Sequence, residues 1–410
     1  MSNSQSKLYS YTDSGAFTSE ISFQKCLEKV HNVAKNTDKL LEHRLFQKEH
    51  ITSPRALHKV ADEISGKYKH LVILGMGGAI LNPQLLANLG RPGHSTRITY
   101  CDHIDSRTIN HLALTLDLEH TAFLVISKSG KTVETIALLS TWYSYMQKQF
   151  ITDLAQRFYI ITQGNGSAIA EMGKQIQAVL LPHDEISGRY ASFTNITILP
   201  GLIAGQDMEL FCRGGMRVLE ELLDSPEDSY ALQGAATMLY ILKHRQNQHV
   251  CIPYKLSLKP FVEWQAQVVA ESLGKDGDGI TPLKAFGPLD QHSQLQLYLD
   301  GPKDKFFTII NTMDSSANTT LPMKLGPLAG HSIHELCDAE CQAMLLVLKD
   351  EDLPHRYLSL THDNEEGLGA LIMHTMLETA LCGLSLGIDP FNQPAVERIK
   401  RHILRELHIA

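Results

Sequence analysis

The feature that most constrains the fold is a strand–turn–helix pattern over residues 121–149. A short apolar run at 121–126 leads into a turn of hydroxyl and ammonium groups at 127–132, and 133–149 carries apolar residues at helical spacing. The first turn of a helix exposes backbone N–H groups and the positive end of the helix dipole. The pattern therefore predicts an anion site, with phosphate as the natural occupant.

An ordinary helix N-cap is the simpler interpretation of the same turn. Ser129 or Thr132 would then cap the helix, and Glu134 would lie in its first turn. That interpretation leaves Lys128 and Lys131 unexplained, because a cap needs no cation. A phosphate ligand accounts for both lysines.

A nucleotide-binding P-loop does not fit the turn. The Gly-Lys-Thr sequence at 130–132 would need a glycine five residues before Gly130, and Val125 stands there. A small phosphoester is therefore favoured over a nucleotide. The residues expected to hold it are Ser127, Lys128, Ser129 and Thr132.

Strand and helix patterns alternate along most of the chain, which predicts an α/β protein with two doubly wound, mainly parallel α/β/α sandwiches. Ligands are expected at the carboxyl ends of the strands. Strands are predicted at 70–74, 97–101, 123–127, 158–162 and 178–181, and again at 250–254, 280–286, 306–311 and 356–361. Helices are predicted near 82–90, 105–116, 133–149, 167–174, 208–223, 229–245, 259–272, 291–299, 332–349 and 367–386.

Four segments follow from this pattern. Residues 1–56 are expected to form a helical N-terminal arm, 57–205 the first sandwich and 206–386 the second. The remaining residues, 387–410, are expected to form a C-terminal helical segment that carries Gln393 and Lys400. No residue-level repeat at a fixed period is present, so a solenoid is not expected.

Composition limits the classes of function. With 410 residues, 43% of them apolar, the chain can bury one or two full cores. A formal charge of −8 disfavours nucleic acid as a partner, so a phosphate site must rely on local cations. Seven scattered cysteines without a CxxC pair suit a reducing, cytoplasmic environment. No apolar run is expected to span a membrane, because the most hydrophobic windows, 71–81 and 196–204, contain glycine or proline.

A glycine-rich turn at 75–78 follows the first predicted strand. It resembles a dinucleotide-binding fingerprint, and Asp102 ends the next strand where a ribose-binding acid would stand. The position of the third glycine is Ile80, which disfavours that interpretation. Gly77 and Gly78 are instead expected to let the backbone approach a ligand closely.

Three later segments carry candidate site residues. Arg189 lies in a Gly-Arg-Tyr sequence and would more often form a surface ion pair, although a nearby phosphate would give it another role. Glu271 ends a helix that Gly274 terminates, with Gln267 one turn earlier on the same face. A carboxylate is disfavoured at a helix C-terminus, which suggests a use as a general base. His292 lies in a polar turn that leads into a helix.

Taken in order, these segments resemble the phosphoglucose isomerase family. The matching blocks are the GxGG turn at 75–78, the hydroxyl-rich loop at 127–135, GRY at 188–190, ESLGK at 271–275, GPLDQHSQLQLYLDG at 287–301 and DPFNQPAVExxK at 389–400. The resemblance implies two sugar isomerase (SIS-type) domains and an aldose–ketose isomerase of glycolysis and gluconeogenesis. Such an enzyme interconverts glucose 6-phosphate and fructose 6-phosphate, as a homodimer, without a metal or other cofactor.

The resemblance also implies roles for the matching residues. Glu271 matches the base that moves a proton between C2 and C1 through a cis-enediol(ate), and Arg189 matches the cation that stabilises this intermediate. His292 and Lys400 match the groups that assist ring opening. The implied sugar contacts are Gln267, Gln393, Gly77 and Gly78, and the implied phosphate contacts are Ser127, Lys128, Ser129 and Thr132.

Some positions depart from the family pattern, and two other functions stay open. Ala79 stands where the family commonly has serine, Ser187 and Ala191 replace the usual glycine and serine around Arg189, and Asn392 replaces an aspartate. A dual phosphoglucose/phosphomannose isomerase is disfavoured by Gln267, because such enzymes carry a smaller hydroxyl residue there. A non-catalytic sugar-phosphate-binding regulator would keep the phosphate loop and lose the proton-handling residues.

A zinc site is a further alternative in the second half of the chain. His334, Cys337 and Cys341 recur at helical spacing and could share one face. Three ligands on one helix without a fourth make a poor site, and buried thiols commonly fill cores. The three residues are therefore expected to be structural.

Overall fold

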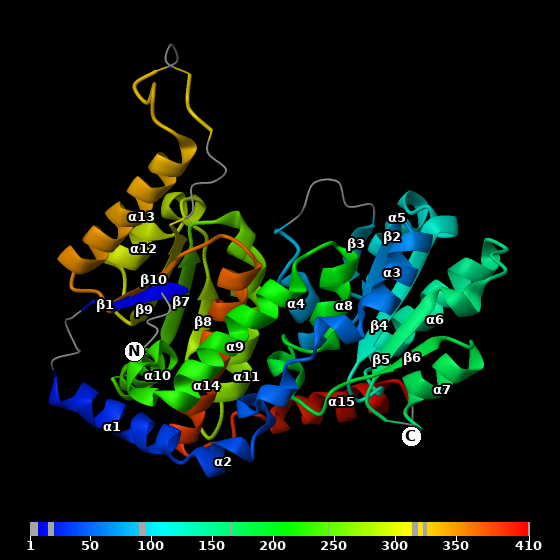
Figure 1. Cartoon of the computed structure of the whole chain (residues 1–410), viewed down its shortest axis with the longest axis horizontal. Coiled ribbons are helices and arrows are strands. Elements are labelled where there is room, and N and C mark those ends of the chain that lie inside the picture. The colour runs from blue at the N-terminus through cyan, green and yellow to red at the C-terminus, as the bar shows by residue number, and fades with distance from the viewer. Residues whose placement is uncertain are drawn as a thin grey trace.

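The computed structural model describes residues 7–14, 20–89, 96–164, 166–244, 246–313, 319–322 and 326–408. Figure 1 shows two lobes side by side, each built around one sheet with helices on both faces. The predicted α/β class with two mainly parallel sheets is confirmed. Most predicted strands lie within two residues of their observed limits.

The first sheet is fully parallel and has the strand order β3-β2-β4-β5-β6. Its strands are β2 (His70–Leu74), β3 (Arg97–Cys101), β4 (Thr121–Ser127), β5 (Phe158–Thr162) and β6 (Val179–Pro182). The chain leaves β2 for β3 on one side and then crosses to β4 on the other. The carboxyl ends of β2 and β4 therefore form the topological switch point, where ligands bind in doubly wound sheets.

The second sheet also has five strands: four repeat the parallel arrangement of the first sheet, and an antiparallel edge strand takes the place of the fifth. Its order is β1-β10-β9-β7-β8, with β1 antiparallel to β10 and the other pairs parallel. Its strands are β1 (Tyr9–Asp13), β7 (Gln248–Pro253), β8 (Thr281–Lys284), β9 (Lys305–Thr312) and β10 (His355–Leu360). The sequence patterns did not predict β1, and the arm expected to be helical thus contributes a strand to the second sheet.

Helices fill both faces of the two sheets. Around the first sheet they are α3 (His58–Lys67), α4 (Gly78–Gln84), α5 (Ser106–Thr115), α6 (Val133–Lys148), α7 (Ala168–Gln175) and α8 (Asn195–Ile203). Around the second they are α9 (Met208–Asp224), α10 (Tyr230–Lys243), α11 (Lys259–Leu273), α12 (Leu295–Asp300), α13 (Ile333–Asp350) and α14 (Glu365–Leu386). The N-terminal arm adds α1 (Ile21–Lys35) and α2 (Thr37–Leu41), and the C-terminal segment forms α15 (Pro394–Glu406).

The inner faces of the two sheets share one hydrophobic core. Leu71 and Ile73 of β2, Phe306 and Ile310 of β9, and residues of α8, α9, α11 and α14 all belong to this cluster. The outer faces have separate cores, one under α6 and one under α13. Burial of this shared apolar surface fixes the carboxyl edge of the first sheet against α11 of the second lobe.

Helix α14 is a long apolar segment that the sequence analysis did not consider as a possible membrane span. It has 22 residues, and by length and composition it is apolar enough to span a bilayer, although it lies outside the two hydrophobic windows at 71–81 and 196–204. In the structure, 94% of its most apolar window is buried. It contacts α9, α10 and α11, so its apolar surface is accounted for by the core of the second lobe.

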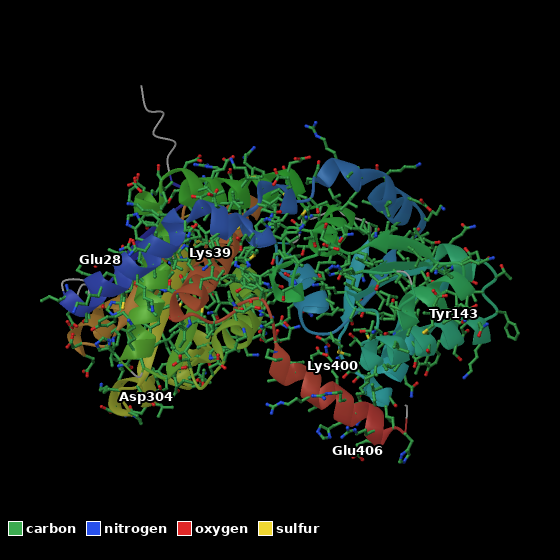
Figure 2. The ribbon with its side chains drawn as sticks, turned by 90° about the horizontal axis from the view of Figure 1, so that it is seen from below. Glu28, Lys39, Tyr143, Asp304, Lys400 and Glu406 are labelled. Atoms are coloured by element: carbon green, nitrogen blue, oxygen red, sulfur yellow. The ribbon has the colours of Figure 1, made fainter. Side chains whose placement is uncertain are left out.

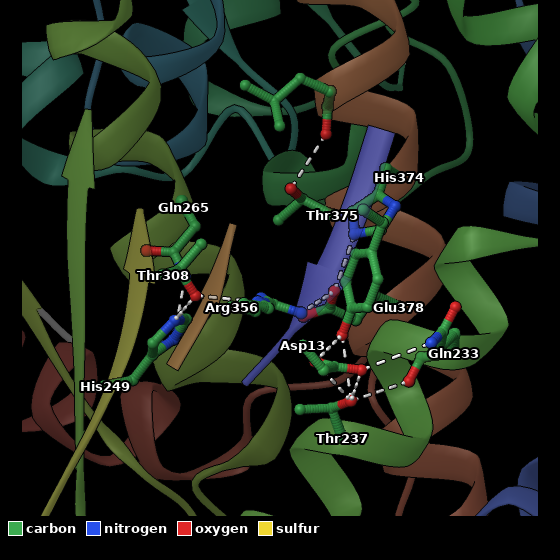
Figure 3. Close-up of polar contacts among 12 residues, drawn as sticks. Asp13, Gln233, Thr237, His249, Gln265, Thr308, Arg356, His374, Thr375 and Glu378 are labelled. Carbon is green, nitrogen blue, oxygen red and sulfur yellow. Dashed lines mark hydrogen bonds and ion pairs between the residues drawn. The ribbon is translucent and has the colours of Figure 1, made fainter. Parts of the chain in front are cut away.

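A buried polar network ties β1 to the second lobe (Figure 3). Glu378 of α14 accepts two hydrogen bonds from Arg356 of β10, at 2.6 and 2.9 Å, and contacts His374 Nε2 at 2.9 Å. The hydroxyl of Tyr9 in β1 lies 2.8 Å from Nδ1 of the same histidine. These contacts satisfy charged groups that would otherwise be costly to bury.

Helix α15 lies apart from the packed core. Figures 1 and 2 show it running beneath the molecule from the second lobe toward the first, with Lys400 along its length. None of its residues is buried. It therefore contributes a wall to a cavity rather than part of a core.

Candidate active site

The predicted anion loop connects β4 to α6, at the switch point of the first sheet. Gly130 has φ +61°, and a Cβ at this position would lie 2.1 Å from Ser167 Oγ, so glycine is required here. Thr132 occupies the N-cap position of α6, but no side chain caps the helix. The first N–H groups of this 16-residue helix are therefore free of a side-chain cap, as an anion-binding helix end requires.

The side chains of the loop surround that helix end. Ser127 Oγ lies 3.3 Å from Thr132 Oγ1, and Ser129 Oγ accepts a hydrogen bond of 3.2 Å from the backbone N–H of Lys131. Burial lowers the pKa of Lys128, and the positive charge of Arg189 lowers it as well, against the opposing effect of Glu185. A half-buried ammonium beside a helix N-terminus makes the loop attractive to a phosphate.

The glycine turn at 75–78 packs directly on the turn that carries Arg189. A Cβ at Gly78 would lie 2.5 Å from the carbonyl carbon of Gly188, so only glycine permits this approach. Asn82 of α4 donates a hydrogen bond of 2.7 Å to the carbonyl oxygen of Gly188, and it accepts one of 3.1 Å from Trp264 Nε1. Three separate segments are thus fixed to one another around the Arg189 backbone.

Arg189 uses all of its guanidinium N–H groups. Nε donates to Ser272 Oγ at 2.8 Å, and Nη1 donates to Glu271 Oε2 and Gln393 Oε1, each at 3.0 Å. Nη2 donates to the carbonyl oxygens of Pro390 and Asn392, at 2.7 and 2.9 Å. Since the Arg189 side chain is only 1% exposed, these contacts fix its orientation.

Glu271 lies in the last turn of α11, with Gln267 one turn before it. Gln267 Nε2 donates to Glu271 Oε1 at 3.0 Å, and the other carboxylate oxygen accepts from Arg189. The Glu271 side chain is 31% exposed, so its carboxylate is reachable from the cavity. The surface ion pair that would be commonest for a lone arginine is therefore replaced by a partly buried contact with the candidate base.

Lys275 closes the C-terminus of α11 just beyond Glu271. Its Nζ donates to the carbonyl oxygens of Glu271 and Ser272, each at 2.9 Å. Burial lowers the pKa of Lys275 to about 8, and the neighbouring positive charge of Arg189 adds to the effect. The ammonium compensates the negative end of the helix dipole beside the carboxylate.

Arg189, Gln267, Glu271 and most of the loop at 127–132 line one cavity of about 550 Å³ between the first sheet, α11 and α15. Its walls include most of the residues that the sequence predicted: Gly77, Gly78, Ser127, Lys128, Ser129, Thr132, Arg189, Gln267, Glu271, Gln393 and Lys400. Lys400 forms an ion pair of 2.7 Å with Glu397 on the same helix. A volume of this size lies within the range of small-molecule binding sites.

His292 does not join this group. It lies on an exposed turn, Leu289–His292, and is absent from the lining of the cavity among the described residues. The exposed apolar side chains of Leu289 and Leu297 lie in the same part of the chain, and they are 69% and 54% exposed.

The positions that depart from the family pattern have clear locations. Ala79 and Ser187 line the cavity, whereas Ala191 is fully buried. Asn392 contacts Arg189 through its carbonyl oxygen, so this contact does not depend on the side chain. The exchange of aspartate for asparagine therefore leaves the hold on Arg189 intact.

The sequence patterns did not predict Asn82, Ser272 or Lys275 as part of the site. Ser272 and Lys275 lie within the ESLGK block at 271–275, but the resemblance of this block was used only to assign a role to Glu271. Asn82 is fully buried in a helix interior, where a polar residue needs a partner. This burial, which indicates a structural role for Asn82, is seen only in the structure.

The zinc alternative finds no support in the side-chain contacts. His334 Nε2 pairs with Asp338 at 3.0 Å, and the thiol of Cys337 donates to the carbonyl oxygen of Tyr254 at 3.0 Å. Among the described ranges, no group of three or more His, Cys, Asp or Glu side chains is arranged to hold a metal. Cys341 is fully buried in the hydrophobic core under α13.

Comparison with known proteins agrees with the geometry. Residues 26–284 match the family model described as phosphoglucose isomerase. A glucose-6-phosphate isomerase of Rubrobacter xylanophilus is 30% identical over 355 residues, covering 80% of each chain. A probable glucose-6-phosphate isomerase of Natronomonas pharaonis is 31% identical over 396 residues, covering 93% of this chain and 90% of the relative.

Solved structures show the same fold. A hypothetical protein of Thermus thermophilus has a TM-score of 0.87 and 25% identity, covering 97% of this chain and 99% of the other. A glucose-6-phosphate isomerase of Chlamydia trachomatis has a TM-score of 0.77 and 21% identity, covering 87% of this chain and 73% of the other, which supports the fold alone. By its matching family model and by these relatives, the chain belongs to the phosphoglucose isomerase family.

Proposed function

We propose that this protein is a glucose-6-phosphate isomerase, which interconverts glucose 6-phosphate and fructose 6-phosphate in glycolysis and gluconeogenesis. The single observation that carries the proposal is the pairing of Glu271 with Arg189 in the cavity that also contains the loop at 127–132. A carboxylate and a fixed cation beside an anion loop suit a proton transfer on a phosphorylated sugar.

In this proposal the phosphate binds at the loop. Ser127, Ser129 and Thr132 provide hydroxyl groups, Lys128 provides charge and the start of α6 provides backbone N–H groups. The grip on the phosphate positions C1 and C2 near Glu271 and so lowers the entropic part of the barrier. Gln267, Gln393 and the turn at Gly77 and Gly78 contact the sugar.

Glu271 then removes the proton from C2 of the open-chain aldose and returns it to C1. The electron pair of the broken C–H bond forms the C1–C2 double bond, and the electron pair of the C1=O double bond moves onto O1, where negative charge develops in the cis-enediolate. The proton of the O2 hydroxyl passes to O1, and the C2=O double bond forms as the shuttled proton returns to C1. Arg189 stabilises the negative charge through Nη1, after the substrate oxygen replaces Glu271 or Gln393 at this atom. Base catalysis and an electrostatic contact of this kind supply roughly 10²–10⁴ and 10²–10³ in rate, respectively.

Ring opening precedes the proton transfer. It is assigned to Lys400, on the cavity wall, and to His292. Because His292 lies on an exposed turn of its own chain, the proposal includes a homodimer in which each chain supplies His292 to its partner's cavity. The exposed Leu289 and Leu297 provide apolar surface for such a contact.

The proposal needs no metal or organic cofactor, because the acid–base groups come from side chains. The sugar phosphate is the only small-molecule partner, and neither nucleic acid nor a membrane takes part. A cytoplasmic location suits the enzyme, since all seven cysteines are free thiols.

The direct test is a coupled assay with glucose 6-phosphate, fructose 6-phosphate and mannose 6-phosphate in excess EDTA. Glucose 6-phosphate and fructose 6-phosphate should interconvert at undiminished rate with EDTA present. Comparable turnover of mannose 6-phosphate would instead identify a dual phosphoglucose/phosphomannose isomerase, against which Gln267 argues. Binding of sugar phosphate without any turnover would identify a regulator.

A further inference from the structure

Ser272 contacts the guanidinium of Arg189 but does not belong to the cavity wall. Its Oγ accepts a hydrogen bond of 2.8 Å from Arg189 Nε and one of 2.9 Å from the hydroxyl of Tyr190. Ser272 is fully buried and does not line the cavity. A buried acceptor with two donors has no surface role to explain it.

We propose that Ser272 is a positioning residue for the isomerisation, because its hydroxyl fixes Arg189 Nε and thereby aims Nη1 at the oxygen that becomes negative. This role rests on the proposed function. Ser272 touches neither the substrate nor the reacting carbons, so it acts only through Arg189.

The distribution of the contacts of Arg189 supports this role. Nη1 donates hydrogen bonds to Glu271 and Gln393, two side chains on the cavity wall that the substrate must approach. At least one of these contacts is exchanged when the substrate oxygen binds Nη1. The contacts of Nε and Nη2 face protein and remain, and since a guanidinium is planar they set the direction of Nη1.

The hydrogen bonds of Nη2 alone would hold the Arg189 guanidinium less rigidly. They go to the carbonyl oxygens of Pro390 and Asn392, in the connection between α14 and the unburied helix α15. Ser272, by contrast, lies within the hydrogen-bonded helix α11, where Val268, Val269 and Leu273 are buried with it. The hydroxyl is therefore the rigid part of the support.

Ser272 also ties the cation to the base. It follows Glu271 directly in the chain, so the carboxylate and the anchor of Arg189 share one turn of α11. Lys275 donates to the carbonyl oxygens of both residues and holds this turn closed. Displacement of the hydroxyl would change the position of the Arg189 guanidinium relative to the Glu271 carboxylate. Catalytic groups must keep their relative positions to within about 0.5 Å.

The experiment compares Ser272→Ala and Ser272→Cys with Tyr190→Phe as the matched control. The alanine removes the acceptor, and the cysteine fills its space with a weak one. Tyr190→Phe removes the other hydrogen bond to the same oxygen and leaves the Arg189 contact in place. Steady-state kinetics with fructose 6-phosphate give kcat and KM, and thermal unfolding checks the fold of each variant.

Binding of a phosphorylated sugar hydroxamate, a planar mimic of the enediolate, provides a second readout. Both Ser272 variants should lose about tenfold to a hundredfold in kcat, less than removal of the cation itself, with KM changed less than about threefold. Affinity for the hydroxamate should fall in parallel with kcat, since both depend on the aim of Nη1. Tyr190→Phe should keep kcat and hydroxamate affinity within about twofold of the wild type.

Wild-type kcat in either folded Ser272 variant would overturn the positioning role, as would an equal loss in Tyr190→Phe. If Ser272→Ala does not fold, the nearly isosteric Ser272→Cys decides the question. Absence of turnover in the wild type would overturn the proposed function and this role together. Turnover in the wild type with unaffected Ser272 variants would overturn the role alone.

Discussion

Nη1 of Arg189 lies 3.0 Å from Oε2 of Glu271, although 82 positions separate the two residues in the chain. The contact joins the carboxyl edge of the first sheet to the end of α11 in the second lobe. It also brings a permanent cation to the carboxylate that is proposed to move the proton. The proposed chemistry therefore requires the two lobes to be packed together. The hydrophobic core that they share holds them in this arrangement.

Arg189→Lys should lower kcat by roughly 100-fold and change KM little, because the lysine keeps the charge but loses the planar fork that reaches Glu271, Gln393 and Ser272. Steady-state kinetics in both directions provide the measurement. Arg213→Lys, on the exposed face of α9, serves as the control and should be neutral. A large rise in KM with unchanged kcat would reassign Arg189 to phosphate binding.

Lys128→Met should weaken binding of the sugar phosphate by roughly 10- to 100-fold, the value of a charge-assisted hydrogen bond. The rise should appear in KM and in the inhibition constant of inorganic phosphate, with kcat less affected. Lys148→Met, at the other end of α6, should leave both constants unchanged. Equal constants for wild type and Lys128→Met would place the phosphate elsewhere in the cavity.

Glu378→Gln should destabilise the protein by about 3–5 kcal/mol, because it leaves the buried charge of Arg356 without its partner. Although burial opposes it, the charge of Arg356 lowers the pKa of Glu378 to about 2, so the pair is ionised at neutral pH. Unfolding in urea measures the loss. Glu351→Gln, which breaks an exposed pair with Lys303, should change stability by less than about 1 kcal/mol.

The carboxyl group of Asp13 should make the folded protein more stable as the pH falls. Burial raises the pKa of Asp13 to about 6, against an unfolded value of 3.8. The folded carboxyl group therefore holds its proton where the unfolded one has lost it, and this stabilising effect is complete below pH 3.8 and lost as the pH rises toward 6.

Compared with Asp13→Asn, the wild type should thus gain on the order of 1–3 kcal/mol as the pH falls from 7.5 to 4. Urea unfolding of both proteins across this range gives the difference and cancels the titration of all other groups. A difference that is constant with pH, or that falls on acidification, would contradict the assignment.

The strands of the first sheet were predictable because each is a short apolar run ended by glycine or polar residues. The limits predicted for 70–74, 97–101 and 158–162 are those observed. The helix α8 was missed because all of its residues except Leu202 are buried, so it shows no polar face to define a period. The strand β1 was missed because a five-residue edge strand depends on its partner β10 rather than on its own pattern.

For the site, the residue blocks were sufficient to name Arg189, Gln267, Glu271 and Gln393, and the structure places all four in one cavity. The contacts that hold them could not be predicted, since they join residues far apart in the chain. The link from Asn82 to Gly188, for example, spans 106 positions. His292 was named by the same reasoning, yet it lies outside the cavity of its own chain.

The central claim is that Glu271 carries the proton between C2 and C1. It is tested most directly by incubating wild type and Glu271→Gln with fructose 6-phosphate in D₂O and excess EDTA, and analysing the product by mass spectrometry. The wild type should form glucose 6-phosphate, a fraction of it with deuterium at C2, because the shuttled proton partly exchanges with solvent. Glu271→Gln should bind the substrate and form neither product nor deuterated sugar, whereas turnover by this variant near the wild-type rate would contradict the account.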